Sequence, residues 1–309
     1  MRKKLLITGG AGMVAQNMLR HPLLAKWVVQ SPSSSELDLR DPGAVRRYFF
    51  HHKPDAVIHA AGVVGGIQAN IQNPLRFLAD NTLMGVNVVA ACVDCRIELL
   101  INIASSCMYP RAIGSGLTEN DILSGPLEST NEGYALAKIV TMRMCEYAVR
   151  EKQNLIYRTL VPCNLYGKWD KFDDSKSHLL AAIIKKISHA KATNSRSVEV
   201  WGDGMARREF MYASDFAEAI LMAVEDPLKI PEVMNVGVGH DYTVNEYYNI
   251  AANVIGWSGD IVHNMSKPVG MARKLLDVSR QIQWGWYPKT SIEDGIRETY
   301  SYYKELKAK

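Results

Sequence analysis

Residues 4–15 read KLLITGGAGMVA, and this stretch decides the fold. It joins a short apolar run at 5–7 to a helical stretch through closely spaced glycines. Gly9, Gly12 and Ala15 form a G-x-x-G-x-x-A turn, in which glycine lets the backbone turn tightly and approach a pyrophosphate. The N-terminus of the following helix offers free N–H groups and a partial positive charge to phosphates. The stretch therefore predicts a strand, a dinucleotide-binding turn and a helix, although a plain strand-to-helix turn has the same outline.

The same alternation continues through the first half of the chain. Apolar runs lie at 27–29, 56–58, 99–103 and 157–161, and helical stretches lie at 13–19, 41–51, 81–93 and 134–150. Strands separated by helices form parallel βαβ units, and continuous apolar strands fit a sheet that is covered on both faces. We therefore expect an α/β protein with a Rossmann-type, doubly wound parallel sheet.

The pattern becomes less regular near Tyr166. A polar loop at 167–177 is followed by a helix and then by a strand at 198–201. We expect residues 1–165 to form the cofactor-binding Rossmann domain. Residues 166–309 are expected to form mainly a smaller, mixed α/β substrate-binding domain, with some segments returning to pack on the first domain.

Composition restricts the classes of protein that fit. The 309 residues include 36 basic and 32 acidic side chains, and no basic block concentrates the net charge of +4, which argues against nucleic-acid binding. No apolar run reaches the roughly 18 residues of a membrane span, and the run at 5–7 is too short for a secretion signal. The five cysteines, an odd number, favour free thiols in a reducing cytoplasm. Cys92 and Cys95 have CxxC spacing, but no second pair completes a zinc set, so no metal site is predicted.

The segment after the second predicted strand indicates which dinucleotide binds. A cofactor with a free ribose 2′-hydroxyl is commonly held by an acidic residue at the end of that strand. Here the strand runs into QSPSSS at 30–35, which contains no carboxylate. Hydroxyl and N–H groups accept a 2′-phosphate whereas a carboxylate repels it, so Ser33 and Ser34 favour NADP over NAD, and Asp38 and Leu39 follow where we expect the adenine. A solvated serine loop without a ligand is the alternative.

A tyrosine and a lysine have the spacing of a proton-transfer pair. Tyr134 and Lys138 lie one helical turn apart on the same face. A nearby cation and the cofactor's positive ring are expected to lower the pKa of the tyrosine, which then passes a proton to or from a sugar oxygen during hydride transfer. Ser105 and Ser106 end the predicted strand 99–103 at its carboxyl side, where such sheets bind ligands. The edge of a core helix explains Y-x-x-x-K equally well by itself, but with the glycine turn and the serines these residues resemble the extended short-chain dehydrogenase/reductase family.

Longer motifs narrow the resemblance. The chain carries SSCMYP at 105–110, VGGIQAN at 64–70, NLYG at 164–167, SH at 177–178, WGDG at 201–204, REF at 208–210, SKP at 266–268 and KLLD at 274–277. In order and spacing, over nearly the whole chain, they are similar to the motifs of the GDP-L-fucose synthases, which are GDP-4-keto-6-deoxy-D-mannose 3,5-epimerase/4-reductases. The VGGI and SSC motifs belong to this branch rather than to the whole superfamily.

The resemblance implies a two-part reaction. A 4-keto group acidifies the hydrogens at C3 and C5, so epimerisation needs an enolate, a base and an acid. In the family, Ser105, Tyr134 and Lys138 surround the keto oxygen, while Cys107 and His178 exchange protons, because thiol and imidazole groups titrate close enough to neutral pH. The same keto carbon then takes a hydride from NADPH. From the residues alone, Cys107 reads as a small buried side chain and His178 as a structural or solvent-facing one.

The resemblance also implies the binding residues. The cofactor-binding set is Gly9, Gly10, Gly12, Met13, Val14, Ser33, Ser34, Asp38, Leu39, Ala60, Ala61, Gly62, Ile103, Ala104, Ser105, Tyr134, Lys138, Pro162, Asn164, Leu165 and His178. The substrate-binding set is Ser106, Asn164, Lys186, Trp201, Arg208 and Lys267. In this set Trp201 stacks on guanine, and Arg208 and Lys267 bind the diphosphate. A cytoplasmic homodimer is implied too, through the helices around 81–93 and 134–150, whose apolar residues a core face explains equally well.

Several positions depart from the family pattern. Lys168, Trp169 and Lys171 replace proline, histidine and asparagine, Lys186 replaces an arginine, and Cys163 replaces a threonine. We expect these positions near the sugar and the nicotinamide, so the sugar stays open. A GDP-4-keto heptose or a 3,6-dideoxy sugar, or C4 reduction without epimerisation, is the nearest alternative. An NAD-dependent sugar-nucleotide 4-epimerase or dehydratase, and a dinucleotide-sensing regulator on the same fold, are more distant ones.

Overall fold

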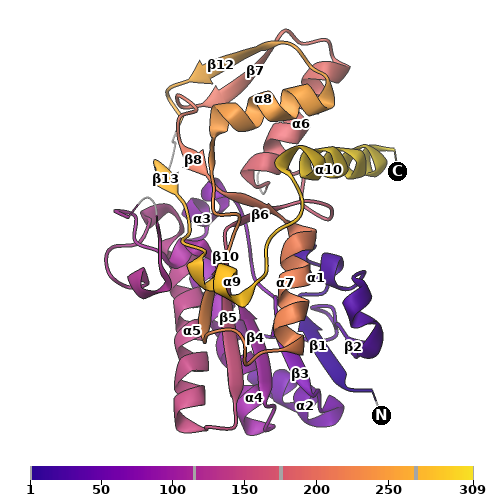
Figure 1. The fold of residues 1–309 in the computed structure, drawn as a ribbon, viewed down its shortest axis with the longest axis vertical. Helices are drawn as coiled ribbons and strands as arrows, with labels where there is room; N and C mark the ends of the chain where they lie inside the picture. Colours follow the sequence, from indigo (N-terminus) through magenta and orange to yellow (C-terminus); the bar gives the residue numbers. More distant parts are fainter. Residues whose placement is uncertain (1, 114–115, 174–176, 268–270, 309) are drawn as a thin grey trace.

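A six-stranded sheet, parallel throughout, forms the centre of the protein (Figure 1). The computed structural model describes residues 2–113, 116–173, 177–267 and 271–308. The strands, in the order in which they pair, are β10 (Val233–Val236), β5 (Ile156–Pro162), β4 (Leu99–Ile103), β3 (Ala56–His59), β1 (Lys4–Thr8) and β2 (Val28–Gln30). The predicted α/β class and doubly wound parallel sheet are confirmed.

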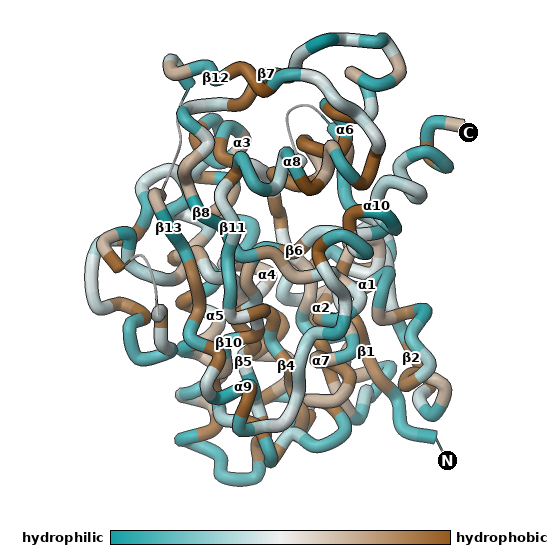
Figure 2. The backbone as a smooth tube through the Cα atoms, turned by 45° about the horizontal axis from the view of Figure 1, so that its top comes forward, coloured by the Kyte–Doolittle hydropathy of each residue, from teal (hydrophilic) through white to brown (hydrophobic). Residues whose placement is uncertain are grey.

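Alternation along β1 explains how the sheet is covered on both faces. Leu5 and Ile7 belong to one hydrophobic cluster, together with residues of α1 (Met13–Met18) and α7 (Ala213–Glu225). Leu6 belongs to the other, with residues of α2 (Pro42–His52) and α4 (Pro74–Asp94). Successive side chains of a strand point to opposite faces, so a fully apolar strand needs helices on both sides. Figure 2 shows the hydrophobic colour on the tube at β1, beside β2.

A reversal of strand order positions the crevice of this sheet. The chain leaves β1 to form β2 on one side and then returns to form β3 on the other side of β1. The chain segments that follow β1 and β3 therefore run in opposite directions from the carboxyl ends of these two neighbouring strands. In open α/β sheets, ligands bind at such a switch point.

The second half of the chain builds a smaller α/β unit above the sheet (Figure 1). Its elements are α6 (Leu179–Ala192), α8 (Val244–Ile255), α10 (Ile292–Lys307) and the parallel pair β7 (Ser197–Trp201) and β12 (Asp260–Asn264), around a core of their own. Between this unit and the sheet lie the pair β6 (Asn164–Tyr166) and β9 (Phe210–Tyr212), and a three-stranded sheet of β11 (Tyr242–Thr243), β8 (Arg207–Arg208) and β13 (Arg273–Lys274). Meanwhile α7, β10 and α9 (Ser279–Trp284) pack with the first unit.

Element boundaries differ from the sequence prediction mainly around α4. This helix begins at Pro74 rather than near 81, and a short helix α3 (Ile67–Gln72) precedes it. Proline at the first helical position is a start signal that the periodicity alone misses, and α3 has no side-chain cap. The start signal at Asp41 is confirmed, because its carboxylate accepts the N–H groups of Gly43 and Ala44.

Helix α4 is long and apolar enough, by length and composition alone, to cross a membrane. It packs against α5 (Glu132–Glu151), α2 and β3. Within it, the side chain of Asn87 donates to the carbonyl of Leu39 (2.9 Å), and the side chain of Asn81 exchanges hydrogen bonds with the backbone of Val63. These contacts are those of a core helix of a folded domain.

Candidate active site

The glycine turn forms a cradle in which backbone atoms approach closely. Gly9 has a φ of +75°, and a Cβ on it would lie 2.7 Å from the Cα of Ala61, after β3. A Cβ on Gly10 would lie 2.2 Å from the hydroxyl of Ser31. Gly12 is the N-cap of α1, so Met13 and Val14 present N–H groups from its first turn. The residues of the crevice thus fit a dinucleotide, since only glycine leaves this much room for a pyrophosphate.

The serine loop after β2 binds a carboxylate that follows it directly in the sequence. Glu36 accepts hydrogen bonds from the N–H (2.7 Å) and the hydroxyl (2.8 Å) of Ser33. Arg40 pairs with Asp38 (2.8 Å) and lies 3.7 Å from Asp80. A cation therefore stands beside the predicted adenine position, although no arginine lies within the loop at 30–35.

Lys138 connects the ends of β3 and β4. Its ammonium donates to the carbonyl of Ile103 (2.8 Å), and a Cβ on Gly62 would lie 3.8 Å from it. Ala60, Ala61 and Gly62 follow β3, and Ala104 follows β4, so these four predicted cofactor residues share one edge of the sheet. Burial lowers the pKa of Lys138 to about 8. The protonated form is therefore lost as the pH rises through that region.

Tyr134 lies in the first turn of α5, beside Ser105 and Phe77. Its ring meets the ring of Phe77 edge-on with centroids 6.4 Å apart, and the Lys138 ammonium is 5.8 Å from its centroid. Burial raises the pKa of Tyr134, the charge of Cys107 acts in the same direction, and a hydrogen bond with Ser105 opposes both. The predicted lowering is thus wrong for the protein's own groups, because burial and Cys107 together outweigh the hydrogen bond with Ser105. A neutral phenol at working pH is a proton donor.

Cys107 has two partners that the sequence reasoning assigned no role. It lies in a single 3-10 turn, Ser106–Met108, for which Ser105 is the N-cap. The side-chain amide of Asn131 donates to its sulfur (3.1 Å), and the ammonium of Lys274 lies 3.9 Å from the same sulfur. Lys274 opens the KLLD motif and Asn131 is the N-cap residue of α5, but neither position indicates in the sequence that its side chain reaches the sulfur.

His178 is the N-cap residue of α6, on the opposite unit from Cys107. The backbone of Gly66, in the VGGI motif, comes close to the carbonyl of Ser177, where an added Cβ would lie at 3.2 Å. Nearby, Asp170 is buried, and its Oδ2 has no hydrogen-bond partner among the described residues. Burial raises the pKa of Asp170, and the His178 imidazole opposes that shift.

Three of the residues predicted to bind the GDP part of the substrate, Lys186, Trp201 and Lys267, lie together. The ammonium groups of Lys186 and Lys267 lie 5.8 Å and 5.6 Å from its ring centroid. The Trp201 side chain is partly open to solvent, and burial lowers the pKa of Lys186. Arg208 belongs to β8. Pro268 of the SKP motif lies outside the described residues.

The remaining predicted residues follow β4 and β5. Ser106 is buried in the turn that holds Cys107. Pro162 ends β5, and Asn164 and Leu165 begin β6, where the amide of Asn164 donates to the carbonyl of Glu209 (2.9 Å). All three leave the carboxyl edge of the sheet.

Comparisons with known proteins decide the family. Residues 5–237 match the NAD dependent epimerase/dehydratase family, which covers most of the chain. A GDP-L-fucose synthase from Azorhizobium caulinodans is 54% identical over 301 residues, spanning 97% of this chain and 96% of that relative. The chain belongs to this family, in the branch of the GDP-L-fucose synthases. The resemblance read from the motifs is confirmed.

Two further similar proteins are named for other sugars. A GDP-L-colitose synthase from Yersinia pseudotuberculosis is 51% identical over 300 residues, 97% of each chain. A GDP-mannoheptose C4 reductase from Campylobacter jejuni, solved with NADP bound, has a TM-score of 0.86 at 27% identity and covers 98% of both chains. Proteins similar to this chain thus carry names of different sugars.

The family departures at Lys168 and Trp169 have partners away from the expected sugar. The Lys168 ammonium pairs with Glu298 of α10 (2.6 Å). The guanidinium of Arg20, which follows α1, lies 4.1 Å from the centroid of the Trp169 ring, and that ring is tilted against the ring of Tyr302 of α10, with centroids 5.1 Å apart. Both side chains therefore connect the loop to α10 and to the residues after α1, and the expectation that these positions lie near the sugar and the nicotinamide stays a prediction.

Replacing Trp169 with alanine is accordingly expected to change stability and leave the product unchanged. Loss of one cation–π contact and one ring pair costs about 1–2 kcal/mol. The melting temperature should fall by a few degrees, while the sugar product and the KM for the GDP-sugar stay within about twofold of the parent. A changed sugar preference in Trp169→Ala, measured on a panel of GDP-4-keto sugars, would return this loop to the binding site.

Proposed function

We propose that the chain catalyses NADPH-dependent 3,5-epimerisation and 4-reduction of GDP-4-keto-6-deoxy-D-mannose to GDP-L-fucose. The observation that carries the proposal is Cys107, with two donors on its sulfur, next to the Ser105–Tyr134–Lys138 group. A simple C4 reductase needs only the latter group. The identity to a GDP-L-fucose synthase over nearly the whole of both chains supports the same reaction.

The chain's own residues divide the reaction between them. The thiolate of Cys107 takes the proton from C3 or C5, and the electron pair enters an enolate at the 4-keto group. His178, from the other unit, supplies a proton to the carbon from a separate element. Tyr134 and Ser105 hold the keto oxygen, and Tyr134 gives it a proton during reduction. NADPH, when bound in the glycine cradle, supplies the hydride for C4.

The cofactor is NADP. A structural relative at 27% identity has NADP bound, and the serine loop, with Arg40 beside it, suits a 2′-phosphate better than a strand-end acidic residue would. Glu36, which accepts from Ser33, is the one group that opposes this assignment among the described residues of the loop. Activity at least tenfold higher with NADPH than with NADH is expected. Co-purified NAD that survives desalting would favour the 4-epimerase or dehydratase alternative instead.

A second candidate has its own support in the GDP-L-colitose synthase relative. Colitose is a 3,6-dideoxyhexose, so its 4-keto precursor has no C3 hydroxyl to epimerise, and only C5 needs inversion. The similarity to a heptose C4 reductase, at the lower identity of 27%, supports a further alternative, which is reduction at C4 without epimerisation.

One isotope experiment separates these candidates. NADPH oxidation is followed with GDP-4-keto-6-deoxy-D-mannose in heavy water, and the product sugar is examined by NMR. We expect deuterium at C3 and C5 of a fucose-configured product. A strong preference for the 3-deoxy substrate would indicate the colitose-type reaction, and NADPH consumption without deuterium uptake would indicate a C4 reductase. Cys107→Ala should lose the exchange, whereas Cys95→Ala, at the end of α4, should keep it.

The substrate domain, the assembly and the location follow as part of the same proposal. We assign substrate binding mainly to the unit of α6, β7, β12, α8 and α10, and cofactor binding to the central sheet. Leu75 and Leu83 on α4, and Leu136 and Val140 on α5, are exposed on two helices that pack side by side, which supports a homodimer in solution. We place the enzyme in the cytoplasm, where its thiols stay reduced.

A further inference from the structure

The small sheet of β8 and β13 presents cations on both of its faces. The two strands pair in parallel, so that Arg273 lies beside Arg207 and Lys274 lies beside Arg208. Because successive residues of a strand point to opposite faces, the first pair and the second pair face different ways. Arg207 and Arg273 meet Asp241, while Lys274 reaches Cys107.

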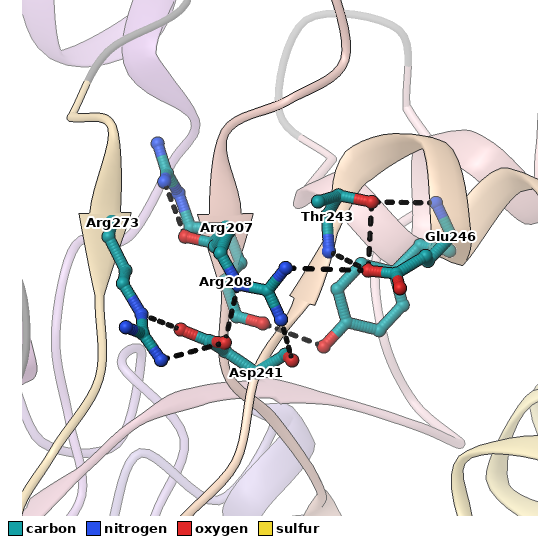
Figure 3. Close-up of polar contacts among 7 residues, drawn as sticks. Arg207, Arg208, Asp241, Thr243, Glu246 and Arg273 are labelled. Carbon is teal, nitrogen blue, oxygen red and sulfur yellow. Dashed lines mark hydrogen bonds and ion pairs between the residues drawn. The ribbon is translucent and has the colours of Figure 1, made fainter.

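The face away from the site is fixed by one buried carboxylate (Figure 3). The Oδ1 of Asp241 accepts from the Nε of Arg207 (2.7 Å), and its Oδ2 accepts from the Nε of Arg273 (2.6 Å). Arg207 also donates to the backbone carbonyl of Asp241 (2.7 Å), and the Asp241 side chain is only 2% exposed. A carboxylate shared by guanidinium groups from neighbouring strands fixes the register of those strands. We call these three residues the Asp241 cluster.

We propose that Lys274 is the charge partner of the Cys107 thiolate, and that the Asp241 cluster holds it in that position. The inference rests on the proposed function, in which Cys107 removes a proton from the sugar. An ammonium next to a thiol favours the thiolate, which is the form that accepts a proton. The amide of Asn131, 3.1 Å from the sulfur, adds a neutral donor to the same atom.

Proton transfer at this site balances without any change at the lysine. The thiolate takes the proton from C3 or C5, the C–H electron pair enters the enolate, and Lys274 keeps its own proton. Returning the proton from the thiol to carbon, or losing it to solvent, restores the ion pair. Lys274 therefore acts by favouring the charged form of Cys107 before each abstraction.

Other charged groups around Cys107 do not substitute for Lys274. Among the described residues, Lys274 from β13 contacts the Cys107 sulfur, and Tyr134 from α5 interacts electrostatically with Cys107. Burial raises the pKa of Tyr134, so it is neutral at working pH. Arg208 of β8 lies beside Lys274 of β13 in the strand pairing. The charge of Arg208 interacts with the carboxylate of Glu128.

Alkylation of the resting enzyme tests the lysine without using the sugar. Iodoacetamide is neutral, so removing a cation does not alter its approach, and peptide mapping gives the rate at Cys107 alone. Lys274→Met is expected to slow alkylation at pH 7 by about tenfold, and the difference should narrow at high pH, where a thiol loses its proton with or without a neighbouring ammonium. Lys274→Arg should recover part of the rate. Alkylation of Lys274→Met at the parent rate would overturn the proposal.

The Asp241 cluster is tested through its coupling to Lys274. Asp241→Asn should slow Cys107 alkylation by about threefold, and the double variant should be no slower than Lys274→Met, because both changes act on one contact. Asp215→Asn is the matched control: this buried carboxylate accepts the backbone N–H groups of Lys289 and Thr290, which lie outside β8 and β13. Equal slowing in Asp215→Asn, or none in Asp241→Asn, would overturn the role of the cluster. If the parent fails to turn over the sugar while alkylation still depends on Lys274, the proposed function fails and this inference stands.

Discussion

Replacing Tyr134 with phenylalanine is expected to lower kcat for C4 reduction by about 10²–10⁴-fold, the usual contribution of a positioned general acid. The phenol is the group at this edge that keeps its proton, because burial raises its pKa. Lys138, whose ammonium is bound to the carbonyl of Ile103, cannot take its place without moving. The loss should appear in stopped-flow measurement of NADPH oxidation with the 4-keto sugar.

The same variant should separate reduction from epimerisation. Cys107 and His178 remain in place, so deuterium exchange into the 4-keto sugar should continue, slowed only by weaker stabilisation of the enolate oxygen. The ring contact with Phe77 is kept, so the melting temperature should stay within about 2 °C of the parent. Tyr147→Phe, an exposed position on the same helix, is the matched control and should react normally. A loss below tenfold in Tyr134→Phe would assign the proton donor to another group.

The sheet was predictable from the sequence because its signals are local. Apolar runs, glycine turns and helix caps such as Asp41 each act over a few residues, and the doubly wound topology follows from their alternation. The strand β10 was not identified, because a short apolar run inside the second half of the chain carries no sign of which sheet it joins. β10 pairs with β5, which is distant in sequence, and this pairing buries all the residues of β10.

The residues of the site could be predicted from the sequence only where they belong to a recognisable motif. Ser105, Tyr134 and Lys138 gather as the resemblance implies, and Lys186, Trp201 and Lys267 form a group of their own. The partners of Cys107 could not be derived, since Lys274 lies 167 residues away in sequence and reaches the sulfur through the register of β8 and β13. The direction of the Tyr134 pKa was also beyond the sequence, because it depends on how deeply the phenol is buried.

Replacing Glu209 with alanine is expected to destabilise the protein strongly, because its carboxylate organises the backbone around it. The Glu209 carboxylate is fully buried in the REF motif. Its Oε1 accepts the N–H groups of Val238 (2.6 Å) and Gly239 (2.9 Å), and its Oε2 accepts that of Leu276 (3.1 Å). Alanine leaves three buried donors without a partner, at about 1–3 kcal/mol each, so a total near 4 kcal/mol and a fall of roughly 10 °C in melting temperature are expected. Glu305→Ala, an exposed change on α10, should stay within about 0.5 kcal/mol of the parent.

Glutamine at position 209 tests whether the charge or the hydrogen bonds matter. Burial raises the pKa of Glu209 to about 7, above the ordinary 4.5, with the backbone hydrogen bonds from Gly239, Leu276 and Val238 opposing the shift. Between these two values the folded chain binds more protons than the unfolded chain, so the stability that Glu209 contributes falls as the pH rises from 4.5 to 7. Glutamine does not titrate and keeps the two bonds to Oε1, so Glu209→Gln should be less stable than the parent at pH 5 and approach or exceed it at pH 8. Thermal unfolding at both pH values checks this, and a constant difference between the two proteins would mean that Glu209 stays ionised throughout.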